Sequence, residues 1–194
     1  MSTAITNKVQ IGQSPTANNN FVLQTPNVPD GTLEIRRGNA AAPGALVAKI
    51  NADGGVNTGG AAFSAYANTV QSLPSAAYAK LIFQVEEYDY LGAFDLVNSR
   101  FTPTVAGVYL FTGGLRVSAA ATLIGALAKN GVVERYLQYV PGSNASSAVY
   151  GAASLYLNGT TDYVELFAFQ GGAVQNTVAG AVATYFQGHL VRAA

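Results

Sequence analysis

Val105-Ala106-Gly107-Val108-Tyr109-Leu110-Phe111 is the stretch of sequence that decides the fold. Alternate residues of a β-strand point to opposite faces of a sheet. Gly107, Tyr109 and Phe111 therefore share one face, while Val108 and Leu110 share the other. Because both faces are apolar, we expect both to be covered, one by the core of the domain and the other by a further layer.

Other strand-like runs surround this stretch from Ala62 onward, where no apolar stripe of helical period extends beyond two turns. The Ala-rich stretch from Ser118 to Ala128 is the one candidate for a helix. It runs into Asn130-Gly131, however, and this strong hairpin signal favours a strand over 122–129. We also expect strands at 79–87, 105–117, 132–139, 148–157, 161–169 and 183–192. Many short antiparallel strands with glycine-bearing turns predict an all-β sandwich of the jelly-roll type.

Residues 1–60 differ from the rest in being rich in Gly, Asn, Pro and Ala. Three short strand-like runs lie here, at 21–25, 32–36 and 46–50, beside the turn pairs Asp30-Gly31 and Asp53-Gly54. We expect a small β-rich attachment or spacer module at 1–60, a hinge at 57–60 and a head at 61–194. So short a set of strands can hardly bury a core alone, so the module is expected to pack against identical copies or a larger assembly.

The composition predicts an oligomer and excludes several kinds of partner. Charged residues make up 10% of the chain and hydrophobic residues 49%, which leaves few charges to cover the surface of a monomer. Ten basic and ten acidic residues balance each other without runs of either sign, so we expect no binding to nucleic acid or to an anionic membrane.

The absence of cysteine excludes disulfides and thiolate chemistry. The first residues lack the apolar region of a secretory signal, and no stretch is apolar enough to span a membrane, so we expect the product to stay soluble where it is made.

Aromatic spacing in the middle of the chain resembles that of the C1q/TNF-like domain. The residues that carry the resemblance are Phe83, Asp89, Phe94, Phe101, Gly107, Tyr109 and Phe111, separated by five, four, six, five, one and one residues. The flanking segments 62–65, 128–131 and 185–190 also resemble the opening strand, central hairpin and closing strand of that family, so the likeness covers about 62–192. Gly113 departs from the pattern, since the family usually has an aromatic residue there, and so does the segment 158–162.

The resemblance implies an antiparallel jelly-roll head that forms a homotrimer. The side chains that it assigns to the core or the trimer contacts are Phe83, Phe94, Phe101, Gly107, Tyr109, Phe111, Phe186 and Leu190. Of these, Phe186 and Leu190 share one face of the last strand, and Gly107 would allow a backbone or ring to approach closely.

The N-terminal module is similar to the leading modules of bacteriophage tail-fibre and virion appendage proteins. The similarity rests on Val9-Gln10-Ile11-Gly12-Gln13-Ser14 and on the segments 21–23, 30–33, 37–39 and 53–56. It implies a virion protein assembled in the cytoplasm of the host. A secreted animal relative of the C1q family would be expected to have a signal peptide and usually a collagen-like stalk.

Catalytic and metal-binding arrangements have little support. His189 is the single histidine, so we interpret it as a strand-surface or trimer-axis side chain rather than a catalytic base. The densest acidic cluster consists of Glu86, Glu87 and Asp89. It could be a calcium site, a glycosidase acid pair or ordinary solvated charge. Adjacent carboxylates on a strand point to opposite faces, which favours solvated charge. We therefore expect no enzyme, no cofactor and no metal, with calcium considered but unsupported.

Tyrosines supply the candidate ligand contacts, because the chain has eleven of them and no tryptophan. Tyr136, Tyr139 and Tyr150 flank the loop 140–147, which contains Asn144, and these four residues are the candidate glycan contacts. The other interpretation is strand packing and trimer contact.

The leading hypothesis is a trimeric bacteriophage virion protein of the tail-fibre or spike type. Residues 1–60 would contact other virion proteins, and the head would present loops to a glycan or protein on the host surface, with threefold avidity. The alternative is a capsid decoration or fibre-trimerisation protein with no role in receptor binding. A polysaccharide depolymerase is disfavoured because the chain is short and lacks a convincing acid pair.

Overall fold

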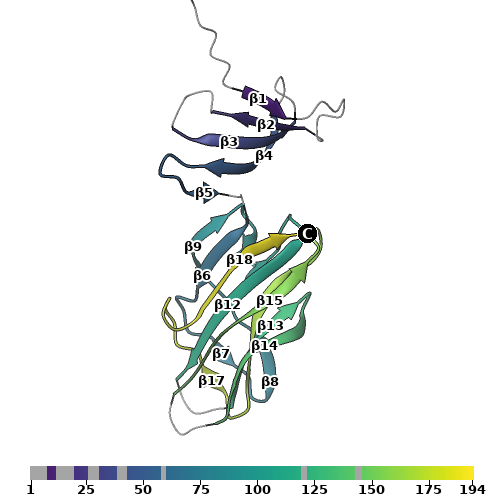
Figure 1. The fold of residues 1–194 in the computed structure, drawn as a ribbon. Helices are drawn as coiled ribbons and strands as arrows, with labels where there is room; N and C mark the ends of the chain where they lie inside the picture. The colour runs from purple at the N-terminus through teal and green to yellow at the C-terminus, as the bar shows by residue number, and fades with distance from the viewer. Residues whose placement is uncertain are drawn as a thin grey trace, which may run out of the picture. The chain divides into compact units, whose positions relative to one another are not determined.

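The computed structural model describes residues 8–11, 20–25, 31–38, 43–57, 60–118, 122–142 and 146–194. Its regular elements are all β-strands, and the chain divides into two compact units, Met1–Gly59 and Gly60–Ala194 (Figure 1). Several residues named above lie outside the described residues, namely Gly12, Gln13, Ser14, Asp30, Thr58, Gly59 and Asn144.

The first unit is an antiparallel meander. Its strands, in spatial order, are β1 (Lys8–Ile11), β2 (Phe21–Gln24), β3 (Leu33–Gly38), β4 (Pro43–Ile50) and β5 (Val56–Asn57). Leu23 pairs with Ile35 and Ile35 with Ala48, so these three side chains share one face of the sheet. A turn at Asp53-Gly54 joins β4 to β5, with Gly54 at a φ of 85°.

The two faces of this meander have opposite character. On one face the Glu34 carboxylate accepts hydrogen bonds from Arg36 Nε at 2.8 Å and Gln24 Nε2 at 2.9 Å. These bonds, that from Arg36 first, lower the pKa of Glu34. The register places Ile11, Phe21, Leu33 and Val56 on the other face together with Leu23, and these four are exposed. An apolar sheet face is therefore left partly open to solvent.

The second unit is a sandwich of two antiparallel sheets. The first, termed the β12 sheet, has the order β15 (Ser147–Leu157), β12 (Gly107–Val117), β18 (Tyr185–Ala193), β6 (Ala62–Tyr66) and β9 (Val85–Tyr90) (Figure 1). The second, termed the β13 sheet, has the order β10 (Phe94–Asp95), β11 (Arg100–Phe101), β16 (Val164–Gln170), β13 (Leu123–Lys129) and β14 (Val132–Val140), and β8 (Ala77–Lys80) also pairs with β16. A small separate pair joins β17 (Gln175–Asn176) to β7 (Ser72–Leu73).

Most of the predicted strands are confirmed, including the strand rather than helix at 123–129. The predicted strand 79–87 is wrong. The chain pairs with the β13 sheet in β8, leaves the ladder at Leu81, and enters the β12 sheet in β9. Side-chain hydrogen bonds hold this crossing segment, since Gln71 Oε1 accepts from Ile82 N at 3.0 Å and Ser99 Oγ from Phe83 N at 2.9 Å. The sequence pattern did not reveal the change of sheet, because apolar residues continue through it and both Leu81 and Phe83 are buried.

An aromatic cluster centred on Phe63 fills the space between the sheets. The Phe63 ring stacks on Phe94 at a centroid distance of 4.6 Å and on Phe101 at 4.8 Å, and meets Phe186 edge-on at 5.0 Å. Offset and edge-to-face pairs of this kind add about 0.5–1.5 kcal/mol each beyond burial. The cluster therefore ties strands of both sheets together.

All eight predicted core or trimer residues lie in or against this core of a single subunit. Seven are buried, and Leu190 is partly buried and packs against the cluster. Burial raises the pKa of Tyr109, whose hydroxyl donates to Val105 O at 2.8 Å. A Cβ on Gly107 would meet Arg192 O at 2.4 Å, so the close approach expected at this glycine occurs within the subunit, against β18. These side chains therefore pack within one subunit, and a role in trimer contacts stays a prediction.

A polar network closes one end of the sandwich. Asn130-Gly131 forms the β13–β14 turn with φ angles of 54° and 80°. Asp162 accepts hydrogen bonds from Asn130 Nδ2 at 2.9 Å and Asn158 N at 2.9 Å, and pairs with Lys129 Nζ at 3.0 Å. These interactions, the bond from Asn130 first, lower the pKa of Asp162 below its ordinary value of 3.8. The carboxylate thus links the hairpin to the β15–β16 connection.

The Asp162→Asn variant should lower the free energy of unfolding by about 1–3 kcal/mol at pH 7, because the partly exposed Lys129 loses the charged partner that the buried Asp162 provides. A lowered folded-state pKa gives stability that is present above the unfolded value and is lost as the pH falls through the folded value. The difference between wild type and variant, measured by urea unfolding, should therefore shrink below about pH 4. Exposed Glu134→Gln is the control, and an Asp162→Asn difference that stays constant between pH 7 and pH 3 contradicts the assignment.

Candidate functional site

The outer face of the β12 sheet is the first candidate surface. Because Tyr109 and Phe111 point into the core, Val108, Leu110 and Thr112 point outward. The register places Tyr156, Ser154 and Ala152 of β15 beside them on one side, and Arg192, His189 and Gln187 of β18 on the other. The predicted second apolar face is therefore mixed, with apolar side chains at one end of β12 and small or polar ones further along.

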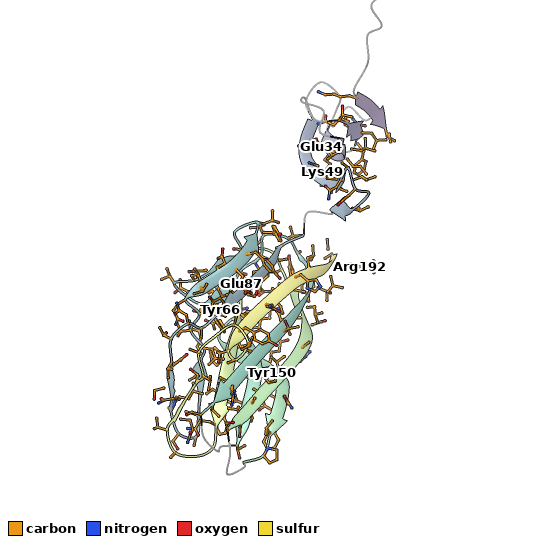
Figure 2. The ribbon with its side chains drawn as sticks, turned by 90° about the vertical axis from the view of Figure 1, so that its left-hand side faces the viewer. Glu34, Lys49, Tyr66, Glu87, Tyr150 and Arg192 are labelled. Carbon is orange, nitrogen blue, oxygen red and sulfur yellow. The ribbon has the colours of Figure 1, made fainter. Side chains whose placement is uncertain are left out.

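A row of tyrosines crosses this face. Gly114 pairs with Tyr150 on one side and Tyr185 on the other, and Tyr185 pairs with Tyr66. The rings of Tyr150 and Tyr185 stack with centroids 6.3 Å apart. A Cβ on Gly114 would come within 2.3 Å of the Tyr185 ring and 2.8 Å of the Tyr150 ring, so the glycine makes room for both. Figure 2 shows Tyr66, Glu87, Tyr150 and Arg192 on this one face.

A chain of hydrogen bonds runs beside the tyrosines. Thr112 Oγ1 donates to Gln187 Oε1 at 3.3 Å, Gln187 Nε2 donates to Ser64 Oγ at 2.9 Å, and Ser64 Oγ donates to Glu87 Oε2 at 2.6 Å. Ser64 is fully buried although it points outward, because its neighbours cover it. The chain joins four strands in sequence, which fixes the side chains across the centre of the face.

His189 and the acidic cluster do not assemble a catalytic site. His189 is exposed and lies opposite Ala62 and Leu110, while Ser64 Oγ is engaged by Gln187 and Glu87. Asp89 pairs with Phe63 and accepts from Phe94 N at 2.8 Å. A bulge between Ser64 and Ala65 in the pairing of β6 with β9 interrupts the alternation of side chains along β9. The expectation that adjacent carboxylates point to opposite faces therefore does not hold along the whole of this strand.

Within the described ranges, no group of three or more His, Asp or Glu side chains could hold a metal ion. In the same part of the chain, no helix is long and apolar enough to cross a membrane.

The outer face of the β13 sheet is the second candidate surface. Tyr139 lies opposite Ile124 and Tyr136 opposite Ala126, on the side of the sheet that faces away from the core. Tyr150 belongs to the β12 sheet. The predicted glycan contacts therefore come from both sheets, Tyr136 and Tyr139 from the β13 sheet and Tyr150 from the β12 sheet. The two strands adjoin, since Tyr150 N donates to Gln138 Oε1 at 2.8 Å. Glycan binding by these residues stays a prediction.

Tyr78, Phe167 and Phe169 lie on the same face as Tyr136 and Tyr139, and the sequence interpretation missed them. Phe167 pairs with Ala126 and Phe169 with Ile124, while Tyr78 lies opposite Phe169. The alternation Phe167-Ala168-Phe169 signalled an aromatic outer face, because Ala168 is buried and its neighbours point the other way.

Solved structures place the fold. No protein-family model and no curated protein matches the chain. The globular domain of zebrafish complement 1qA protein is similar to it with a TM-score of 0.53 and 21% sequence identity, over 70% of this chain and 99% of that chain. Murine APRIL, in its structure at pH 8.0, is similar with a TM-score of 0.50 and 12% identity, over 68% and 99%. At such low identity the likeness establishes the fold alone, and it confirms the prediction of a C1q/TNF-like antiparallel jelly-roll sandwich.

Two neighbouring glycines test which face is which. Gly113→Ala should lower the free energy of unfolding by about 1–2 kcal/mol, because its Cβ would lie 2.8 Å from the buried Leu166 methyl groups. Gly114→Ala should change that free energy by less than about 1 kcal/mol, since the Tyr150 and Tyr185 rings can move toward solvent. Urea unfolding measures both variants, and loss of the nuclear Overhauser effect between the two rings reports their separation. The reverse order of destabilisation would mean that the faces are assigned wrongly.

Proposed function

We propose that this chain is a homotrimeric structural protein of a bacteriophage particle, of the tail-fibre or spike type, whose head contacts the host surface. The protein acts by binding rather than by catalysis. The observation that carries the homotrimer is the outer face of the β12 sheet. It combines exposed tyrosines and aliphatic side chains with a neutral centre.

The charges on this face support a second copy of the chain as its partner. Glu87 lies on the edge strand β9, while Arg116 and Arg192 lie close to the ends of their strands. Val108 lies beside Arg192, and Leu110 and the tyrosines lie further along the face, with Tyr150 and Tyr156 about half exposed. A face with a neutral centre offers little to a charged partner, but it suits an identical neutral surface. The low fraction of charged residues in the chain, 10%, also predicts that such a surface is buried against another copy.

The first unit supports a role in attachment to the particle. Its apolar face carries the exposed side chains Ile11, Phe21, Leu33 and Val56. Such a face gains stability when another apolar surface covers it. We infer that other virion proteins provide the apolar surface that covers this face. The inference agrees with the resemblance of this segment to the leading modules of phage appendage proteins.

Three heads on one particle would multiply weak contacts. A linked second binding event is intramolecular, so avidity can exceed the affinity of one site by 10² to 10⁴ without new contacts. A modest site on each head is therefore sufficient for adsorption to a cell.

Leu110→Glu tests assembly and attachment together. Leu110 points outward and is not part of the core cluster, so a charge there should block association while the subunit stays folded. Wild-type protein should sediment at about 60 kDa, three times the subunit mass of 20.0 kDa, and the variant at one subunit mass. Saturating wild-type protein should block adsorption of particles that carry it, and the variant should need roughly 100-fold more.

The matched control is Val132→Glu, which places the same charge at an exposed position of the β13 sheet. It should sediment and compete like wild type. A wild-type monomer at micromolar concentration would refute the trimer. Unchanged particle adsorption at saturating trimer would instead leave capsid decoration or fibre trimerisation as the role.

A further inference from the structure

An aromatic row crosses the outer face of the β13 sheet. Tyr78 pairs with Phe169, Phe169 with Ile124, and Ile124 with Tyr139, so these side chains line up across four neighbouring strands. The Tyr78 and Phe169 rings lie with centroids 5.2 Å apart and tilted by 50°. Tyr139 is 58% exposed at one end of the row, and Tyr136, on the same strand, is 61% exposed.

Tyr78 and Tyr136 meet by their hydroxyls across this row. Two strands, β16 and β13, lie between the strands that carry them. At about 4.8 Å per strand, the two backbones are roughly 14 Å apart, so both side chains must lie along the sheet to reach each other. Ala126, on the strand next to Tyr136, leaves room and is fully buried.

The contact links the two side chains across the face. Burial and the hydrogen bond with Tyr136 raise the pKa of Tyr78 to about 12. The pair therefore presents two aromatic rings and two phenol hydroxyls on this face.

The surroundings of these rings are electrically balanced. Lys80, next to Phe167 in the register, pairs with Glu165 at 3.0 Å and also donates to Asn98 O at 2.9 Å. Each charge is thus already compensated by a neighbour. A neutral ligand fits this face better than an anionic one, which would have to compete with Glu165 for the ammonium group.

We propose that Tyr78, Tyr136, Tyr139 and Phe169 form an aromatic platform that stacks on the rings of a neutral glycan. The inference rests on the proposed function and deepens it, because it names the class of surface ligand and the side chains that bind it. A sugar ring presents an apolar C–H face with hydroxyls around its rim. Ring faces matched with phenol hydroxyls supply both kinds of contact. The platform lies on the sheet opposite to the proposed assembly face, so trimer formation leaves it accessible.

The test titrates the full-length protein with maltohexaose, cellohexaose and chitohexaose, with polysialic acid as the anionic probe and decaproline as the peptide probe. Ring proton shifts of the tyrosines report binding. At least one neutral hexasaccharide should bind, and both Tyr136→Ala and Tyr139→Ala should weaken it by about tenfold. Val132→Ala, on the same strand and also exposed, should bind like wild type. The circular dichroism spectrum of each variant should match that of wild type.

Three results would overturn the platform. These are failure of the wild type to bind any of the neutral hexasaccharides, binding by both tyrosine variants as tight as that of the wild type, and binding of decaproline or polysialic acid alone. Adsorption of particles separates this failure from failure of the proposed function. Protein that blocks adsorption but binds no neutral sugar leaves the attachment role standing without the platform. Protein that binds sugar through Tyr136 but does not block adsorption leaves the platform standing and removes the attachment role.

Discussion

The packing of aromatic rings around Phe63 is the constraint on which the rest of the head depends. Tyr109 and Phe111 are fully buried, and the ring centroids of Phe111 and Phe63 lie 6.4 Å apart. Since alternate residues of a strand point to opposite faces, burying these two rings forces Val108, Leu110 and Thr112 onto the outer face. The interior of one subunit thereby determines which side chains it can offer to another molecule.

Sequence patterns were sufficient for the class of fold and most of its strands. The alternation in 105–117 and the Asn130-Gly131 pair each depend on local backbone geometry, and both predictions are confirmed. The strand expected at 79–87 failed because a change of sheet depends on tertiary contacts, here the side-chain acceptors Gln71 and Ser99. Buried apolar residues on both sides of the crossing left no break in the pattern.

The candidate contacts were harder to predict than the fold. Tyr139 and Tyr150 flank one loop, so nearness in sequence suggested one site, but their strands belong to different sheets. Tyr78 lies far away in the sequence and reaches Tyr136 only because β8 pairs with β16. Strand pairing decides which side chains share a face, and a single sequence does not specify that pairing. In the proposed protein the two outer faces then have separate tasks, one for assembly and one for a glycan.

Hydroxyl-radical footprinting of the purified full-length protein tests the proposed assembly face most directly. In a single subunit, Tyr150 and Tyr156 on the β12 sheet are 44% and 51% exposed, and Tyr136 and Tyr139 on the β13 sheet are 61% and 58% exposed. Comparable exposure predicts comparable oxidation for an isolated subunit. If copies of the chain associate through the β12 sheet, Tyr150 and Tyr156 should be oxidised several-fold more slowly than Tyr136 and Tyr139. Equal oxidation of all four tyrosines would contradict the account.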